Sequence, residues 1–160
     1  MIDGLRIGLG LDTHRLEPGR PCRLGGVLLE SPVGPVGHSD ADVVLHAAVD
    51  AVLSAAGQED LGSLFSDQDP RNAGRDSSEF CREASRRATE QGLRVLSLDI
   101  VVEAEQPRLA PHRQAMREHI ASLFAMTVDR VNLRGKTAEK LGSIGRGEAI
   151  RATAVALLGP

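Results

Sequence analysis

The stretch HSDADVVLHAAVDAVLSAAG, residues 38–57, predicts a strong helix. Its apolar residues recur every three or four positions, which is the spacing of one buried helix face. That face consists of Val43, Val44, Ala47, Ala48, Ala51, Val52 and Ala55. Gly57 follows the last turn, where glycine commonly ends a helix because it adopts a left-handed backbone easily. We therefore expect a helix from about residue 40 to the glycine, with its apolar face in the core.

The rest of the chain mixes strand and helix patterns on both sides of this helix. Strand patterns cover 5–14, 21–29 (a strand pair or hairpin with Gly25-Gly26 as the turn or a bulge), 95–105, 130–134 and 150–158. Helix patterns cover 77–91 and 111–125, and loops are expected at 30–37, 57–76 and 135–149. Because there is no strict βαβ period, we expect an α+β fold, with residues 1–160 forming a single domain that has a mixed β-sheet flanked by helices.

Composition argues against several classes of function. Aromatic residues make up 2% of the chain, with neither Trp nor Tyr, so no stacking platform for single-stranded nucleic acid is available. The net charge of -3 also argues against a nucleic-acid partner. No apolar run approaches the ~20 residues that a membrane span needs. Cys22 and Cys81 form no CxxC pair and follow no signal peptide, so we expect reduced thiols and a cytoplasmic location.

A carboxylate and an imidazole stand two residues apart in GLGLDTHRL, residues 8–16. Positions i and i+2 of a strand share a face, so Asp12 and His14 converge on one point. His46, on the polar stripe that Asp42 and Asp50 also occupy, supplies a third donor. Two imidazoles and a carboxylate with one open position are typical of a catalytic zinc site. The alternatives are a plain His–Asp hydrogen bond and an ordinary solvated helix face.

The start of the same helix favours phosphate binding. Ser39-Asp40-Ala41-Asp42 fits a capping box with Ser39 as its first residue, and His38 stands beside it. The free N–H groups of a helix start can hold a phosphate. An ordinary cap with nothing bound is the alternative interpretation.

Two further segments carry polar residues. GKTAEKLGSIGRGEA, residues 135–149, combines glycines with Lys136, Thr137 and Glu139, which suits a phosphate and a divalent cation such as Mg²⁺. It is not a P-loop, since Arg130 stands where that motif needs glycine. FSDQDP, residues 65–70, taken alone is a turn signature that presents Asp67 and Asp69.

Taken in order, five segments resemble the 2-C-methyl-D-erythritol 2,4-cyclodiphosphate synthase family of the non-mevalonate isoprenoid pathway. They are GLGLDTH, GHSDADVVLHAAVDAVLSAAG, DLGSLFSDQDP, AEQPRLAPH and EKLGSIGRGEAI, which together run from residue 8 to residue 150. The resemblance implies a lyase that converts 4-diphosphocytidyl-2-C-methyl-D-erythritol 2-phosphate to the 2,4-cyclodiphosphate and releases CMP. It also implies a homotrimer, with strands toward the threefold axis and each active site between two subunits.

The resemblance also implies roles for individual residues. Asp12, His14 and His46 match zinc ligands, and Glu139 matches a residue that helps a second ion, Mg²⁺ or Mn²⁺, to bridge the diphosphate. His38 and Thr137 match residues that position or stabilise phosphate oxygens. The matches to the methylerythritol phosphate pocket are Ser39, Asp60, Gly62, Phe65, Asp67 and Asp69. The matches to the cytidine-binding segment are Ala104, Pro107, Arg108, Leu109 and Ala110.

Five positions depart from the family pattern, two of them only mildly, since Thr13 and Ala41 stand where Val and Gly are common. Lys136 and Ala138 replace hydroxyl residues, and Lys136 is expected to add positive charge beside the diphosphate. Ser143 stands where the family often has Phe, in the lining of a cavity on the threefold axis where Arg146 can bind isoprenoid diphosphates. Two other functions fit the same residues: a zinc-dependent phosphohydrolase or phosphodiesterase, and a trimeric protein that binds nucleotides or isoprenoid diphosphates without turnover.

Overall fold

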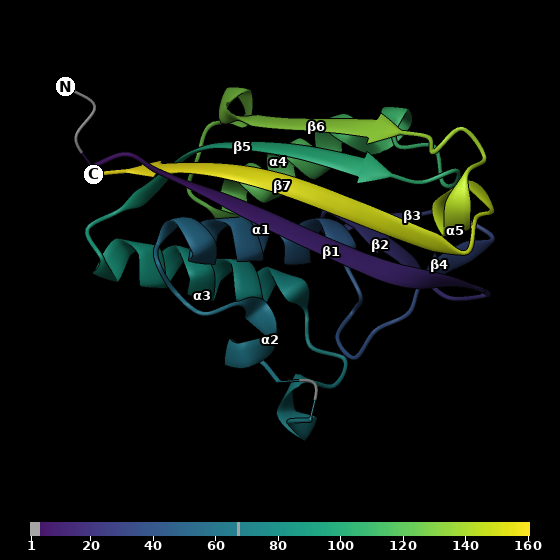
Figure 1. The fold of residues 1–160 in the computed structure, drawn as a ribbon, viewed down its shortest axis with the longest axis horizontal. Helices are drawn as coiled ribbons and strands as arrows, with labels where there is room; N and C mark the ends of the chain where they lie inside the picture. The colour runs from purple at the N-terminus through teal and green to yellow at the C-terminus, as the bar shows by residue number, and fades with distance from the viewer. Residues whose placement is uncertain (1–3, 67) are drawn as a thin grey trace.

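The computed structural model describes residues 4–66 and 68–160 and has one mixed sheet with helices on one face (Figure 1). The strands are β1 (Arg6–Pro18), β2 (Cys22–Leu24), β3 (Val27–Leu29), β4 (Val33–Pro35), β5 (Arg94–Glu103), β6 (Val131–Lys136) and β7 (Ala149–Gly159). The α-helices are α1 (Val43–Ala55), α2 (Leu61–Leu64), α3 (Ser77–Glu90), α4 (Arg113–Leu123) and α5 (Gly142–Gly145). The α+β class is therefore confirmed, and no helix among the described residues has the length and apolar character of a membrane span.

The five-stranded sheet has the order β4-β1-β7-β5-β6. β1 pairs antiparallel with both β4 and β7, and β5 pairs antiparallel with β7 but parallel with β6. β2 and β3 form the expected hairpin, with Gly25 and Gly26 at the turn. In Figure 1, α1, α2 and α3 lie below the sheet, α4 lies behind it and α5 lies at its right-hand end, and α1 packs on β1 and β7.

Helix α1 is buried on almost every side. It lies between the sheet and α3, and of its thirteen residues only Asp50 and Ser54 are not buried. The polar stripe predicted from the sequence is therefore not a solvated face. Asp42, which precedes the helix, is fully buried, and His46 is 8% exposed. A helix buried all round leaves its few polar side chains to be satisfied by other parts of the chain.

Two glycines let β1 lie directly against α1. A Cβ added at Gly8 would be 1.9 Å from the carbonyl oxygen of Ala51, and one added at Gly10 would be 2.0 Å from that of Ala47. No side chain fits at either distance. The two glycines share their strand face with Asp12 and His14, since side chains alternate along a strand. The close approach therefore brings His46 of α1 level with the polar end of β1.

The opposite face of the sheet exposes apolar residues. Ile7, Leu9 and Leu11 of β1 are 74%, 54% and 54% exposed, and Val155 of the neighbouring β7 is 42% exposed. In the register of the two strands, Leu9 lies opposite Val155. Monomeric soluble proteins seldom expose a contiguous apolar patch of this kind, so the face is suited to contact with another protein surface.

Several local predictions were wrong. The expected loop 30–37 contains β4, a short edge strand in which Pro35 is tolerated because an edge strand pairs on one side only. Gly34 fits there because a Cβ would lie 2.3 Å from the carbonyl oxygen of Pro21. The loops 57–76 and 135–149 contain the single-turn helices α2 and α5. Helix α1 begins at Val43, and its N-cap is Asp42 instead of Ser39, because the Asp42 carboxylate accepts the N–H of Leu45.

Candidate metal centre and active site

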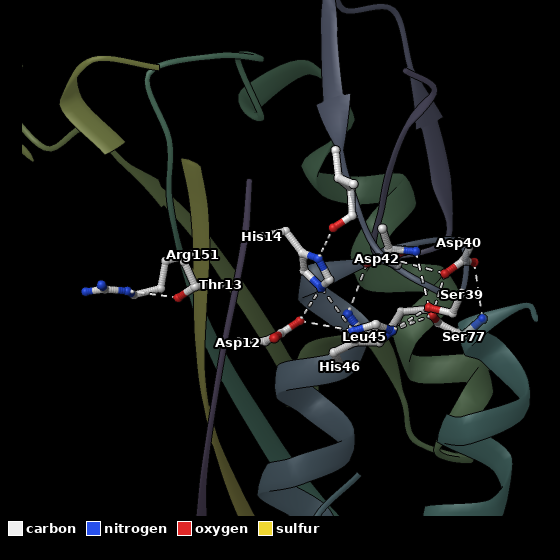
Figure 2. Close-up of polar contacts among 12 residues, drawn as sticks. Asp12, Thr13, His14, Ser39, Asp40, Asp42, Leu45, His46, Ser77 and Arg151 are labelled. Carbon is white, nitrogen blue, oxygen red and sulfur yellow. Dashed lines mark hydrogen bonds and ion pairs between the residues drawn. The ribbon is translucent and has the colours of Figure 1, made fainter. Parts of the chain in front are cut away.

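Asp12, His14 and His46 bring three metal-ligating atoms together (Figure 2). Asp12 Oδ2 lies 2.8 Å from His14 Nε2 and 3.0 Å from His46 Nδ1, and the two imidazole nitrogens are 3.3 Å apart. The strand alternation puts Thr13 on the other side of β1, where it accepts a hydrogen bond from Arg151. The same-face prediction for Asp12 and His14 is thus confirmed, and His46 joins them from α1.

The hydrogen bond on the far side of His14 decides which of its ring nitrogens carries the proton of the neutral imidazole. Its Nδ1 is 2.6 Å from the carbonyl oxygen of Val36, which can only accept, so Nδ1 carries the proton. In the neutral ring the lone pair of Nε2 therefore points toward Asp12 and His46, and in the charged ring Nε2 donates a hydrogen bond to Asp12. Burial lowers the pKa of His14, but the adjacent Asp12 carboxylate outweighs it and raises the pKa above its ordinary value.

The Asp12 carboxylate is held in its charged form. Burial raises its pKa, but hydrogen bonds and charges from His14 and His46 outweigh burial and hold the pKa well below its usual range. A carboxylate anion beside two imidazoles is a suitable donor set for zinc, which binds nitrogen and oxygen ligands.

The spacing of the three atoms also fits a metal ion. Zinc bonds to His and Asp of about 2.0–2.1 Å in a tetrahedron separate the ligand atoms by about 3.3–3.4 Å. The three separations, 2.8, 3.0 and 3.3 Å, range from about half an ångström below that value up to it, so a small outward movement of Asp12 would admit the ion. Among the described residues, this is the one group of three His, Cys, Asp or Glu side chains with metal-binding geometry. The donor set and the spacing therefore fit a divalent ion.

A cavity of about 370 Å³ opens over the triad. Besides the three ligands, its wall includes His38, Ser39, Gly62 and Phe65, four of the residues predicted to hold phosphate or substrate. Asp60 caps α2 at the edge of this region by accepting the N–H of Ser63, and Asp69 is paired with Arg71. Asp67 lies outside the described residues.

A second cavity, of about 470 Å³, gathers the predicted cytidine-binding segment. Its wall contains Ala104, Pro107, Arg108, Leu109 and Ala110, together with Lys136 and Thr137 from the end of β6 and the loop after it. No residue of this wall belongs to the wall of the cavity over the triad. Within one chain the predicted site residues therefore form two groups.

The profile of the YgbB family matches residues 5–159. The chain belongs to the YgbB family. A relative from Burkholderia thailandensis, named 2-C-methyl-D-erythritol 2,4-cyclodiphosphate synthase, is 49% identical over 153 residues, which are 96% of this chain and 94% of the relative.

Solved structures of the same family agree with the fold. A 2C-methyl-D-erythritol-2,4-cyclodiphosphate synthase in a CDP-bound form superimposes with a TM-score of 0.88 at 44% identity, over 96% of this chain and 99% of that one. The bifunctional IspDF from Campylobacter jejuni gives a TM-score of 0.93 at 35% identity and covers 97% of this chain. This chain spans only 42% of that bifunctional protein.

The remaining predicted residues of this YgbB-family chain lie in the loop that follows β6. Glu139 is exposed, and its Oε1 accepts a hydrogen bond from Thr137 at 2.8 Å. Ser143 and Arg146 are exposed, and Arg146 is paired with Glu148. Neither residue lines the cavity over the triad or the cytidine cavity.

Sequence reasoning placed Asp42 beside His46 on a polar stripe and thereby missed its role. Both Asp42 oxygens are used at the base of α1, where they accept the N–H groups of Gly25, Gly26 and Leu45. Asp42 therefore ties the β2–β3 hairpin to the helix that carries His46. Its neighbours Gly25 and Gly26 were recognised as a turn, but no local pattern linked that turn to a carboxylate sixteen or seventeen residues away.

The sequence predicted only one of the two phenylalanines in the wall of the triad cavity. Phe65 was expected, but Phe80 of α3 packs on it with ring centroids 4.6 Å apart, and the Arg75 guanidinium lies 5.2–5.4 Å from both rings. The helical spacing of Phe80 in α3 indicates a core position, and Phe80 is indeed buried. That spacing gives no sign that Phe80 also lines the triad cavity beside Phe65.

Proposed function

We propose that this chain converts 4-diphosphocytidyl-2-C-methyl-D-erythritol 2-phosphate to 2-C-methyl-D-erythritol 2,4-cyclodiphosphate and CMP. The observation that carries the proposal is the Asp12–His14–His46 cluster under its own cavity, in a chain 49% identical to proteins named as that synthase. The CDP-bound form of a related structure supports a substrate that carries cytidine diphosphate.

The reaction is an internal phosphoryl transfer. An oxygen of the 2-phosphate attacks the β-phosphorus of the same molecule, and the bond from that phosphorus to the oxygen bridging it to the α-phosphate breaks, which releases CMP. The attacking oxygen is already anionic, so no general base has to remove a proton. The protein must hold the two ends of a flexible substrate together and offset the charge of three phosphates.

Asp12, His14 and His46 hold a zinc ion in this proposal, and Glu139 contributes to a Mg²⁺ or Mn²⁺ site shared with the substrate phosphates. When bound, these ions supply positive charge against the α- and β-phosphate oxygens. A single exposed carboxylate suits the second ion, since Mg²⁺ is usually held by one or two carboxylates together with substrate phosphates.

The chain's own polar groups position the phosphates. His38 at the mouth of the triad cavity and Thr137 in the cytidine cavity donate hydrogen bonds to phosphate oxygens, and Lys136 adds a positive charge beside Thr137. Ser39, Asp60, Gly62, Phe65, Asp67 and Asp69 form the pocket for the methylerythritol phosphate. Ala104, Pro107, Arg108, Leu109 and Ala110 receive the cytidine. Ser143 and Arg146 are assigned to a separate anion site near the axis of the assembly.

The assembly we propose is a homotrimer in which β1 and β7 face the threefold axis. Two features support it: the exposed apolar residues on the outer face of those strands, and the division of the site residues between two cavities. In a trimer, the triad cavity of one subunit and the cytidine cavity of the next together form one active site.

Product analysis tests the reaction directly. The protein is incubated with the substrate, Zn²⁺ and Mg²⁺, and the products are identified by phosphorus NMR, with His46→Ala as the inactive control. Cyclic diphosphate and CMP, lost in the control, are the expected result. A hydrolysed, non-cyclic product would support a phosphohydrolase instead, and unchanged substrate with a folded, zinc-loaded protein would support a binding protein.

A further inference from the structure

A buried hydroxyl lies behind the metal-ligating histidine. Ser77, the first residue of α3, is fully buried, and its Oγ is 2.9 Å from Nε2 of His46, the ring nitrogen that faces away from Asp12 (Figure 2). The carboxylate of Asp40 holds this serine at both of its polar groups. One oxygen accepts the Ser77 hydroxyl in a short hydrogen bond, and the other accepts the Ser77 backbone N–H at 3.1 Å.

The hydrogen-bond donors and acceptors along this chain of contacts favour one tautomer of His46. A carboxylate only accepts hydrogen bonds, so the single hydroxyl proton of Ser77 goes to Asp40. The Ser77 oxygen is then left as an acceptor for a proton on Nε2. A neutral imidazole has one N–H, so this contact leaves a lone pair on Nδ1, the atom that faces Asp12 and His14. Without a cation the Asp12 carboxylate, also an acceptor, favours a proton on Nδ1, and Ser77 acts against that competition.

A second hydroxyl near Nε2 does not have this effect. Ser39 Oγ is 3.0 Å from Nε2 and accepts the N–H of Ala41, but its own proton is not committed to a carboxylate. It can therefore either accept from Nε2 or donate to it, and donation would move the ring proton to Nδ1. Of the two hydroxyls, only Ser77 selects the form in which Nδ1 is free to bind a metal.

We propose that Ser77, oriented by Asp40, is a positioning residue that holds His46 in the metal-binding tautomer. The inference deepens the proposed function, since it concerns the zinc centre on which that function rests. It also gives the Asp40 carboxylate, which no sequence pattern assigned, a role in the site. Such contacts behind a metal-ligating histidine typically change metal affinity by about 10–100-fold.

The test measures zinc binding, without turnover. Affinity for Zn²⁺ is determined on the metal-free protein by competition with a chromophoric chelator, for the unaltered chain and for Ser77→Ala. The matched control is Ser78→Ala, which removes the next residue of the same helix: Ser78 is also buried, but its hydroxyl contacts His119, 3.2 Å away. We expect about a 10–100-fold loss for Ser77→Ala and no loss for Ser78→Ala.

Two further measurements test whether Ser77 and Asp40 act on the His46 proton or only support the local structure. Asp40→Asn is expected to weaken zinc binding, and the double variant with Ser77→Ala to bind no more weakly than Ser77→Ala alone, because Asp40 acts through Ser77. Long-range proton–nitrogen NMR on the metal-free protein is expected to find a larger share of the His46 ring proton on Nε2 in the unaltered chain than in Ser77→Ala.

The outcomes are distinguishable. Equal zinc affinity of Ser77→Ala and the unaltered chain, or additive losses in the double variant, would overturn the inference while leaving the proposed function intact. Zinc binding by the unaltered chain no stronger than that of His46→Ala would overturn both. If circular dichroism finds Ser77→Ala unfolded, the zinc affinity of Asp40→Asn and its share of His46 proton on Nε2, each compared with the unaltered chain, decide the question by the same criteria.

Discussion

Replacing Gly10 by alanine should separate the two elements that carry the metal ligands. The added Cβ would lie 2.0 Å from the carbonyl oxygen of Ala47 and 2.5 Å from the nitrogen of Ala51, both backbone atoms of α1. Real Cβ contacts essentially never fall below 3.0 Å, so β1 and α1 must move apart by at least 3.0 minus 2.0, which is 1.0 Å. A backbone oxygen inside a helix cannot turn aside as a flexible side chain can.

The expected loss of unfolding free energy is about 3 kcal/mol, the upper end for overpacked cores, because backbone meets backbone. For a chain of this size, that corresponds to a melting temperature lower by about 6–12 °C. His46 precedes Ala47 on α1, while Asp12 follows Gly10 on β1 by two residues. Metal sites tolerate ligand displacements of about 0.2 Å, so a shift of 1 Å should also weaken zinc binding at least about tenfold.

Urea unfolding and chelator competition measure the two effects on the same protein. Gly62→Ala is the control for stability, since its Cβ would meet only Asp60 Oδ1 at an ordinary 3.6 Å. We expect that control to change the unfolding free energy by less than about 0.5 kcal/mol. A Gly10→Ala protein as stable and as tightly zinc-binding as the unaltered chain would refute the reasoning that close backbone packing sets the ligand geometry.

Three other perturbations test separate features. Asp42→Ala leaves three N–H groups without their acceptor and should lower the free energy of unfolding in urea by about 3 kcal/mol or more. A loss below about 1 kcal/mol, the net value of one typical hydrogen bond, would argue against the tie between hairpin and helix. Because Asp12 outweighs burial and raises the pKa of His14 above 6.5, protons should compete with zinc for Nε2 already above that pH; affinity that holds constant down to pH 6.5 would contradict this. Leu11→Glu should dissociate the proposed trimer in sedimentation velocity. Leu28→Glu, which changes an exposed leucine of β3, should not. An unaltered chain that sediments as a monomer would refute the proposed trimer.

The metal triad could be predicted because its geometry follows from strand alternation. Asp12 and His14 are two residues apart on one strand, and that spacing alone puts them on one face. His46 required a further step, since its distance from β1 depends on how closely the helix packs. Gly8 and Gly10 carry that information, but glycines in a strand pattern are also typical of bulges, so the close approach became evident only in the structure.

The start of α1 could not be placed from the sequence because two residues compete for the cap. Ser39 and Asp42 are both favourable N-caps. The choice depends on long-range contacts: Asp42 is held by the Gly25–Gly26 turn, while Ser39 turns toward His46. Ser77 is the first residue of the predicted helix 77–91, and its contact with a histidine 31 residues away has no local signature.

Strand β1 has a constraint on its length as well as on its composition. Its inward residues include the packing glycines and two metal ligands, and its outward residues include the exposed Ile7, Leu9 and Leu11. Insertion or deletion of one residue between Leu11 and Asp12 would put the two parts of the strand out of phase, so that either the metal ligands turn outward or the apolar residues turn against α1. One such event would therefore remove either the metal site or the apolar surface. Variation in this strand is therefore confined to substitutions at fixed length, and changes in chain length belong in the loops beyond it.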